Sequence, residues 1–266
     1  MATFESSLKA RLIYVYAIPD DAHRNCLKIG ETTLDEDNGS EITPNCELLN
    51  RAARKRIDGQ TRTAGIAYQL LHTESTVFIR SGAIGTFNDK QVHEILRRSG
   101  IKKKEFPGVS GRADEWYCCD LETAKKAIVA AKQGRSSLQA NEISEEHTPI
   151  IFRPEQSSAI EKTIKRFRHG NKMLWNAKMR FGKTLSALQV VKEEGYRRTI
   201  ILTHRPVVDE QWFEDFGKIF YDAPTYHYGS RDKGESFHSL ERLYKRGENY
   251  VYFASMQDLR GSEQVG

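Results

Sequence analysis

The segment Met173-Leu-Trp-Asn-Ala-Lys-Met-Arg-Phe-Gly-Lys-Thr-Leu-Ser-Ala-Leu188 decides the fold of the second half of the chain. It contains the pattern A-x-x-x-x-G-K-T, with a short apolar stretch before it and an apolar-periodic stretch after it. This arrangement predicts a strand, a loop and then a helix. Backbone N–H groups of such a loop and of the helix start can surround an anionic phosphate. We therefore expect residues 177–184 to form a phosphate-binding P-loop.

Several residues of this loop are expected to contribute to ATP binding. Gly182 lets the backbone approach closely, Lys183 reaches the β- and γ-phosphates, and Thr184 ligates Mg²⁺. Ala177 stands where the common pattern has glycine, and alanine is small enough if its φ stays negative. The predicted ATP-binding loop comprises Ala177, Lys178, Met179, Arg180, Phe181, Gly182, Lys183 and Thr184.

The length of 266 residues leaves room for about two domains. Residues 134–148 are polar and nearly free of large apolar side chains, which is typical of a linker. We therefore predict a domain over 1–133, a linker over 134–148 and a second domain over 149–266. In the second domain strand and helix patterns alternate, which predicts a parallel α/β sheet.

The first domain has a different sequence pattern, in which short β-branched and aromatic runs are separated by turns and helical stretches. Asn88 is a suitable N-cap and Gly100 a suitable C-terminal stop for one of the helices. The predicted strands are 11–18, 26–31, 68–79 and 115–119, and the predicted helices are 47–57, 88–99 and 121–132. This pattern predicts an α+β domain with a small antiparallel sheet.

Composition restricts the class of protein. No apolar run approaches the ~18 residues of a membrane span, and the N-terminus carries no signal-peptide pattern. None of the four cysteines lies in a C-x-x-C pair, so we expect reduced thiols and a cytoplasmic protein that does not contact membranes. The net charge of +5 is compatible with DNA binding without requiring it. The oligomeric state does not follow from any of these patterns.

Three segments around the P-loop complete a pattern that runs from residue 150 onward. They are Phe152-Arg-Pro-Glu-Gln156, Arg197-Arg-Thr-Ile-Ile-Leu-Thr-His-Arg-Pro206 followed by Gln211-Trp212, and Tyr250-Val-Tyr-Phe-Ala-Ser-Met-Gln-Asp-Leu-Arg-Gly261. With them the chain resembles superfamily 2 helicases and translocases, especially the ATPase subunits of restriction enzymes. The resemblance implies a RecA-like lobe that uses ATP and moves on DNA. It places Gln156 at an adenine-reading position, where an amide can pair a donor and an acceptor. It also places His204 and Arg205 in a loop that touches the DNA backbone.

The segment Val207-Val-Asp-Glu210 imitates the acidic Mg²⁺ motif of such enzymes. Because Pro206 interrupts the preceding strand, we predict a helix over 207–219 instead. The family's own D-E-x-H motif lies beyond the segment that ends here. We therefore expect a partial RecA-like lobe that binds nucleotide weakly and does not hydrolyse ATP efficiently by itself.

A second set of short motifs lies in residues 1–133, in the order Val15-Tyr-Ala-Ile18, Lys28-Ile-Gly30, Arg56, Asp89 to His93, and Glu115-Trp-Tyr117. In this order they resemble the GIY-YIG nuclease superfamily. The resemblance implies that Tyr16 helps to activate water, that Arg56 clamps phosphate, and that Asp89 ligates Mg²⁺ or Mn²⁺. Lys28 takes the place of a tyrosine, and His93, one helical turn from Asp89, is placed to assist. The basic residues Arg51, Arg54, Lys55 and Arg62 are candidate DNA contacts.

The same residues also have simpler interpretations. Tyr16 alone fits packing on a half-buried strand, and the arginines of one helix fit a solvated surface. Lys28 and the short Asp89 both depart from the family pattern, so the domain either cuts DNA or only binds it. Three hypotheses follow: a nuclease coupled to an ATP-dependent DNA translocase in restriction or defence, a nuclease-inactive module that loads such a translocase on DNA, and a regulatory ATP-binding protein.

Overall fold

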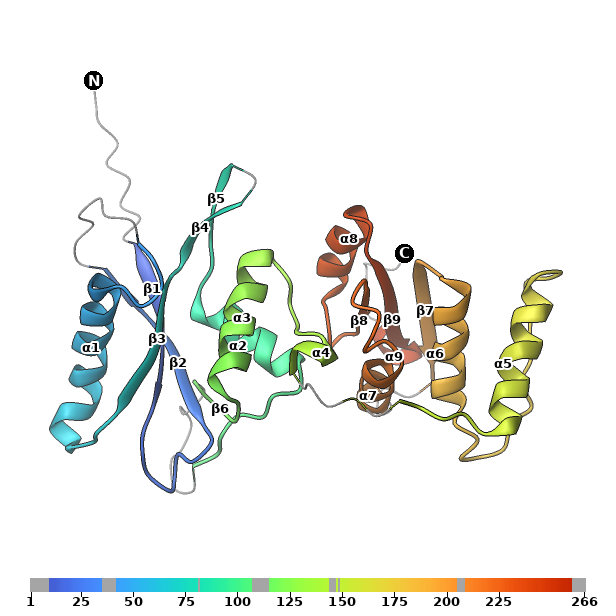
Figure 1. Ribbon diagram of the computed structural model, residues 1–266, viewed down its shortest axis with the longest axis horizontal. Coiled ribbons are helices and arrows are strands. Elements are labelled where there is room, and N and C mark those ends of the chain that lie inside the picture. The colour runs from blue at the N-terminus through green and yellow to red at the C-terminus, as the bar shows by residue number, and fades with distance from the viewer. Residues whose placement is uncertain are drawn as a thin grey trace. The chain divides into compact units, whose positions relative to one another are not determined.

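The computed structural model describes residues 10–34, 42–80, 82–106, 115–143, 147, 149–204 and 209–259. The chain divides into two compact units, Met1–Arg135 and Ser136–Gly266. Figure 1 labels the elements of both. Among the described residues, none of the helices has the length and apolarity needed to cross a membrane.

Within its described residues, the first unit is built on a four-stranded antiparallel sheet in the order β3-β1-β2-β6. The strands are β1 (Arg11–Ala17), β2 (Leu27–Thr33), β3 (Gln69–Ser75) and β6 (Trp116–Tyr117). A separate hairpin follows β3 and consists of β4 (Val77–Arg80) and β5 (Ala83–Thr86). The helices are α1 (Glu47–Thr61), the 3-10 helix η1 (Arg62–Ala64), α2 (Asp89–Arg98) and α3 (Leu121–Gln133). Figure 1 shows α1 on one side of the sheet and α2 and α3 on the other.

Strand β1 sends alternate side chains to the two sides of this sheet. Leu12, Tyr14 and Tyr16 share one face, because neighbouring side chains of a strand point in opposite directions. They form a buried cluster with a stripe of apolar residues of α1, namely Leu49, Ala53 and Ile57. The spacing of four residues puts that stripe on one side of the helix. The first core therefore fixes α1 over the face that carries the two tyrosines.

The helices expected in this unit form, and α2 begins as predicted. The Asn88 side chain accepts the Gln91 N–H at 3.0 Å, and the Gln91 side chain accepts the Asn88 N–H at 3.0 Å. Helix α1 extends beyond the predicted end at residue 57 and continues to Thr61. It continues because Ile57 and Thr61 are both buried, and the Thr61 hydroxyl donates to the Ile57 carbonyl at 3.0 Å.

The strands differ from the prediction in two places. The strand expected over 68–79 ends at Ser75, and Val77 starts β4. The break occurs because Thr76 donates both its N–H and its hydroxyl to the Arg11 carbonyl, each at 3.0 Å. The strand expected over 115–119 is reduced to β6, which pairs with Leu27 and Lys28 of β2.

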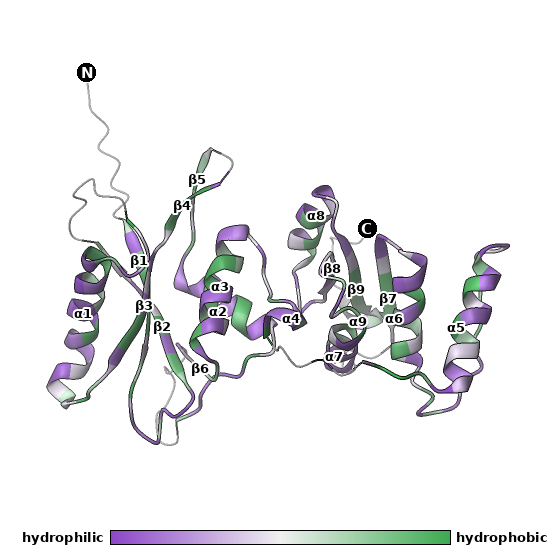
Figure 2. Cartoon of the chain, viewed as in Figure 1, coloured by the Kyte–Doolittle hydropathy of each residue, from purple (hydrophilic) through white to green (hydrophobic). Residues whose placement is uncertain are grey.

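The second unit has, among the residues described for it, a three-stranded parallel sheet in the order β7-β9-β8. Its strands are β7 (Arg198–Thr203), β8 (Tyr226–Gly229) and β9 (Asn249–Ser255). Its helices are α4 (Ala140–Ile143), α5 (Pro154–Phe167), α6 (Lys183–Glu194), α7 (Asp209–Ile219), α8 (Phe237–Lys245) and α9 (Met256–Leu259). Figure 2 shows hydrophobic residues gathered in β7 and α6. The buried cluster joins α6, α7 and the strands through Leu188, Phe216, Tyr228, Val251 and Phe253. The parallel sheet predicted for this half is confirmed.

The strand expected before the P-loop does not form, and this prediction is wrong. Residues 172–178 have no regular structure and no strand pairing. Instead the Trp175 indole N–H donates to the Thr163 hydroxyl of α5 at 2.7 Å, and its ring meets the edge of Phe181. Leu174 is 90% exposed. The segment therefore packs on α5. Strand formation depends on pairing with other strands, and the sequence of a single segment does not determine that pairing.

Asp209 and Glu210 begin α7, which lies within the helix predicted over 207–219, while positions 207 and 208 lie outside the described residues. The Asp209 carboxylate accepts the hydroxyl of Tyr228 at 2.5 Å and that of Ser230 at 2.7 Å. These bonds give Asp209 a structural position at the start of α7.

Residues 136–143 lie in the second unit, although the sequence pattern placed them in the predicted linker 134–148. Ser136 and Ser137 donate to the buried carboxylate of Glu235, and Leu138 is 3% exposed. The boundaries 1–133, 134–148 and 149–266 remain a proposal.

Candidate nucleotide and nucleic-acid sites

The loop from Ala177 to Gly182 leads into α6. Arg180 and Gly182 have left-handed backbone conformations, with φ of 61° and 86°. Only glycine adopts such a conformation at little cost, because it has no Cβ atom. Lys183 opens α6, and its Nζ donates to the carbonyls of Lys178 at 2.9 Å and Ala177 at 3.4 Å. The ammonium therefore lies over the loop, bonded to carbonyls that a phosphate could replace.

Gln156 joins the start of α5 to this loop, and its side chain is buried. Its Oε1 accepts the N–H of Arg153 at 2.8 Å, and its Nε2 donates to the Phe181 carbonyl at 2.9 Å. The Arg153 guanidinium makes a second connection, donating to the carbonyls of Phe181 at 2.5 Å and Arg180 at 3.1 Å. Both ends of the Gln156 amide thus bond to the chain itself, and adenine reading by this residue stays a proposal.

The groups around the start of α6 fit a nucleoside triphosphate. The first N–H groups of a helix lack intrahelical partners and lie at the positive end of its dipole. Lys183 adds a positive charge and Thr184 a hydroxyl in the same turn. Lys183 would hold the terminal phosphates of ATP, and Thr184 would hold its Mg²⁺. The other predicted loop residues include Lys178, Met179 and Arg180, all of them exposed.

In the first unit, Tyr14 of β1 lies directly opposite Gly30 of β2. A Cβ atom on Gly30 would come within 2.7 Å of the Tyr14 hydroxyl oxygen, so glycine leaves room for this ring. Burial, followed by the charge of Glu115, raises the pKa of Tyr14, while the charge and hydrogen bond of Arg56 oppose that rise. Asp89 raises the same pKa further. Arg56 and Asp89 therefore both lie within electrostatic range of one phenol.

Lys28 is held between three elements. Its Nζ donates to Oε1 of Gln60 in α1 at 3.2 Å and lies 3.3 Å from the carboxylate of Glu115, just before β6. The same nitrogen lies 5.8 Å from the centre of the Tyr16 ring, which is within cation–π range. Lys28 stands at the sequence position where the resemblance expects a tyrosine.

Asp89 is the first residue of α2 and reaches the later part of β2. Its N–H donates to Oε2 of Glu31 at 3.3 Å, and Glu31 also accepts from Arg11 at 2.6 Å. Burial raises the pKa of Asp89, the carboxylate of Glu31 raises it further, and His93 opposes this rise. His93 donates its Nε2 to the Ile29 carbonyl at 2.8 Å, which fixes its ring against β2.

Tyr16 is more buried than expected for a residue that activates water, with 2% of its surface exposed. Its ring packs edge-on against Tyr68 and Trp116. Burial, followed by the charges of Tyr14 and Glu115, raises its pKa well above the ordinary value. Tyr16 is therefore packed away from solvent.

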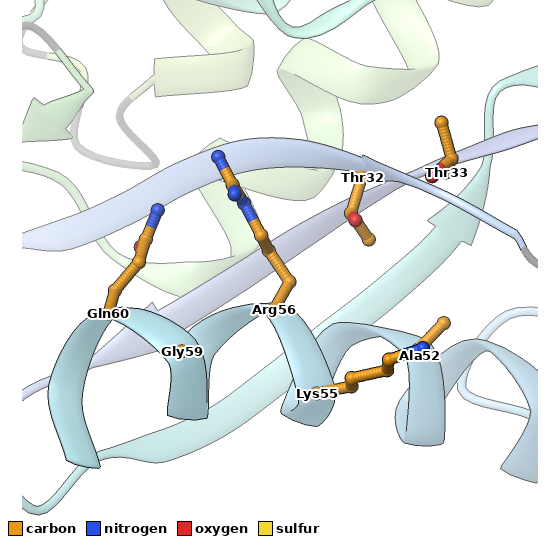
Figure 3. A pocket seen from close by; sticks show the side chains of 7 residues that line it. All are labelled: Thr32, Thr33, Ala52, Lys55, Arg56, Gly59 and Gln60. Carbon is orange, nitrogen blue, oxygen red and sulfur yellow. The ribbon is translucent and has the colours of Figure 1, made fainter. Parts of the chain in front are cut away.

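A groove of about 300 Å³ opens beside Arg56 on the α1 side of β2. Figure 3 shows the side chains of Arg56 and Gln60 extending from α1 toward β2, where Thr32 and Thr33 lie. Its walls consist of Thr32, Thr33, Ala52, Lys55, Arg56, Gly59 and Gln60. The other DNA-contact candidates of this unit, Arg51, Arg54 and Arg62, are exposed. His204 is exposed beyond β7, and Arg205 lies outside the described residues.

The structure therefore brings together Arg56, Lys28 and Asp89, and it adds residues that sequence reasoning missed: Tyr14, Glu31 and Gln60. Two of these carry a recognisable signal. Tyr14 lies two residues before Tyr16 on the same strand face, and Gln60 lies one helical turn after Arg56. The contact of Glu31 with Asp89 joins distant parts of the sequence and has no local signal.

The residues around Asp89 provide a locally negative setting that suits a divalent cation. Within the parts of the chain that the structure describes, no group of three or more His, Cys, Asp and Glu residues is arranged to hold a metal ion. The resemblance implies a single acidic ligand, and it assigns that role to Asp89.

Comparison with known proteins identifies the second half of the chain. Residues 149–265 match the family described as type III restriction enzyme, res subunit. These residues form a helicase-like restriction-enzyme domain.

A curated protein of Mycoplasma pneumoniae (strain ATCC 29342 / M129), provisionally named a type II restriction enzyme and methyltransferase, C-terminus, is 29% identical to the chain over 117 residues. The match covers 42% of this chain and 16% of that protein, so the chain spans a small part of its relative's length. No solved structure matches the chain.

Proposed function

We propose that this chain is a DNA-processing protein in which a metal-dependent endonuclease domain of GIY-YIG type is coupled to an ATP-dependent helicase or translocase for DNA restriction or defence. The restriction-enzyme domain over 149–265 supports the motor half. One observation carries the nuclease half. Arg56, Lys28 and Asp89 come from three different elements and lie along β2, and an open groove lies beside Arg56.

Phosphodiester cleavage needs a bound phosphate, an activated water and positive charge for the pentavalent transition state. Arg56 would bind the phosphate oxygens, since its guanidinium presents paired donors. Lys28, held by Gln60 and Glu115, would add positive charge next to them. Asp89 would hold Mg²⁺ or Mn²⁺, an ion that supplies further positive charge and acidifies bound water. His93 and Tyr16 would assist from the protein side of the site.

In the motor half, Lys183 and Thr184 would hold ATP with its Mg²⁺ and Gln156 would lie near the base. His204 and Arg205 would touch the DNA backbone after β7. Arg51, Arg54, Lys55 and Arg62 of the first unit would hold DNA by charge, which makes binding salt-dependent.

A second function is favoured by the surroundings of Tyr16 and Lys28. Tyr16 is buried and Lys28 is paired with Glu115, so neither presents a free hydroxyl or base to a water molecule. A nuclease-inactive domain that binds DNA and loads the translocase would retain the same basic surface.

The deciding experiment is nicking of supercoiled plasmid with Mg²⁺ or Mn²⁺, with Arg56→Ala beside the unchanged chain. Arg24→Ala is the matched control, since this exposed arginine pairs only with its neighbour Asp21 among the contacts described for it. We expect metal-dependent nicking that Arg56→Ala abolishes and Arg24→Ala retains. DNA binding without nicking in all three proteins would replace the nuclease with the loading module.

A further inference from the structure

The hairpin of β4 and β5 exposes an apolar face. Ile79 pairs directly with Ile84 across the hairpin, and Val77 pairs with Thr86. Because side chains alternate along a strand, these four lie on the same face. Ile79 and Ile84 are 77% and 76% exposed, and Val77 is 39% exposed. Figure 1 shows the hairpin projecting beyond the sheet, and Figure 2 shows its hydrophobic character. Contiguous exposed apolar surface of this kind marks an interaction site.

The opposite face holds the hairpin in place. The Phe78 ring covers Gly85 so closely that a Cβ atom there would lie 2.5 Å from the ring. The same ring contacts Phe87, with centroids 6.2 Å apart. Arg80 donates to the carbonyl of Gln133 at the end of α3, at 2.6 Å. These contacts hold the hairpin in place, so its exposed face is preorganised for binding a partner.

A short chain of contacts connects the hairpin to the candidate nuclease site. Thr76, the residue before β4, donates to the Arg11 carbonyl, and the Arg11 side chain binds Glu31. Glu31 accepts the N–H of Asp89, which itself follows β5 after two residues. DNA held at Arg56 and Asp89 would therefore extend past the base of this hairpin.

We propose that the β4–β5 hairpin is the element of the first unit that enters the major groove of duplex DNA, with Ile79 and Ile84 contacting the methyl groups of thymine. The major groove admits a two-stranded ribbon, and apolar side chains there contact the thymine C5 methyl group. Charge agrees with this partner, because β4 and β5 carry one arginine and no acidic residue that would repel phosphates. The proposal rests on the DNA-processing function proposed above.

The test uses the full chain with Ile79→Ser/Ile84→Ser and, as control, Ile66→Ser at another exposed isoleucine of the same unit. Binding is measured to a random-sequence duplex made with thymine and to the same duplex made with uracil. We expect the double variant to bind the thymine duplex about tenfold more weakly, from lost apolar contact. Its salt dependence should stay unchanged, because no phosphate contact is removed. Uracil should weaken the unchanged chain but not the double variant.

Unchanged binding of the double variant, or no duplex binding by the unchanged chain, would overturn the proposal. A shift of oligomeric state in sedimentation with DNA binding intact would also overturn it, since the face then belongs to a second copy of this chain. Plasmid nicking by the same proteins separates the two proposals. If the unchanged chain nicks plasmid and the double variant binds DNA equally well, only this inference fails. If DNA binding depends on Ile79 and Ile84 but no plasmid is nicked, only the nuclease proposal fails.

Discussion

The side chain of Gln156 occupies the space that a Cβ atom on Gly182 would need, with Nε2 only 2.3 Å from that position. Gln156 cannot easily move away, because its amide bonds to Arg153 and Phe181. Gly182 also has a φ of 86°, which side chains other than glycine's adopt at a cost. Gly182 is therefore required for two reasons. Its backbone conformation favours glycine, and a side chain at this position would disturb the Gln156 contact that joins α5 to the loop.

Gly182→Ala should destabilise the second unit by about 2–3 kcal/mol, from left-handed strain plus the loss of Gln156 hydrogen bonds. Gly195→Ala is the matched control, because Gly195 has a φ of 65° and no atom within 4 Å of an added Cβ. Its cost should be limited to the backbone term, about 1 kcal/mol. Urea unfolding of the two variants measures the difference. Equal losses would show that the contact with Gln156 adds nothing.

Lys28→Met should lower DNA affinity and nicking together, because it removes one positive charge and leaves the Glu115 carboxylate without this partner near the phosphate. The double variant Lys28→Met/Glu115→Gln removes both charges of the pair. It should recover most of the affinity, since a repelling carboxylate is gone, but nicking should stay at least about tenfold reduced if Lys28 acts on the reacting phosphate.

The control for this pair is Lys125→Met/Glu122→Gln, which removes an exposed ion pair of α3. It should leave both DNA affinity and nicking near their original values. Full recovery of nicking by Lys28→Met/Glu115→Gln would mean that Lys28 only neutralises Glu115.

Glu235→Gln should cost the second unit about 2–3 kcal/mol, measured by urea unfolding. The carboxylate is 2% exposed and accepts from the backbone N–H groups of Ser136 and Ser137 and from the hydroxyls of Ser136 and Ser239. An amide would turn N–H groups toward some of these donors. Ser239→Ala removes one of these four hydrogen bonds to Glu235 and should cost only about 1 kcal/mol. A loss no larger for Glu235→Gln than for Ser239→Ala would contradict this account.

Local patterns predicted the parts of the fold that depend on local chemistry. The sequence predicted a helix over 47–57, where α1 forms, and Asn88 as the N-cap of α2. The failures depend on distant partners. Thr76 ends β3 through the Arg11 carbonyl, and residues 172–178 lack strand neighbours among the described residues. Neither feature leaves a trace in the surrounding sequence.

The candidate site shows the same division. Motif order was sufficient to propose Lys28, Arg56 and Asp89, which the fold then places around one strand. The burial of Tyr16 agrees with the simpler interpretation of this residue as packing on a strand. Period two alone could not decide between the two interpretations, because it does not show which strand face a helix covers. The pairing of Lys28 with Glu115 became visible only once β6 was paired with β2.

Glu74 of β3 makes the stability of the first unit depend on acidity. Burial alone would raise the pKa of this carboxyl, but hydrogen bonds from His72 and Lys132 outweigh it and the net pKa is lowered. A group with a lowered folded pKa stabilises the fold above its unfolded pKa and loses this contribution as pH falls through the folded value. The stabilising contact should therefore be complete at neutral pH and disappear in acid.

Glu74→Gln should lower the free energy of unfolding by about 1–2 kcal/mol at neutral pH. The difference from the unchanged chain should begin to shrink as pH falls below the unfolded pKa of about 4.3, and should vanish below the lowered folded pKa, where both proteins carry a neutral group at this position. Glu94→Gln is the control, because the pKa of Glu94 is also lowered, chiefly by its hydrogen bond with Arg97, but its side chain is 47% exposed. Its effect should stay within about 0.5 kcal/mol at every pH. Urea unfolding monitored between neutral and acid pH gives both profiles. A constant offset between Glu74→Gln and the unchanged chain would assign the loss to packing, because only an ionised carboxylate makes the difference vary with pH.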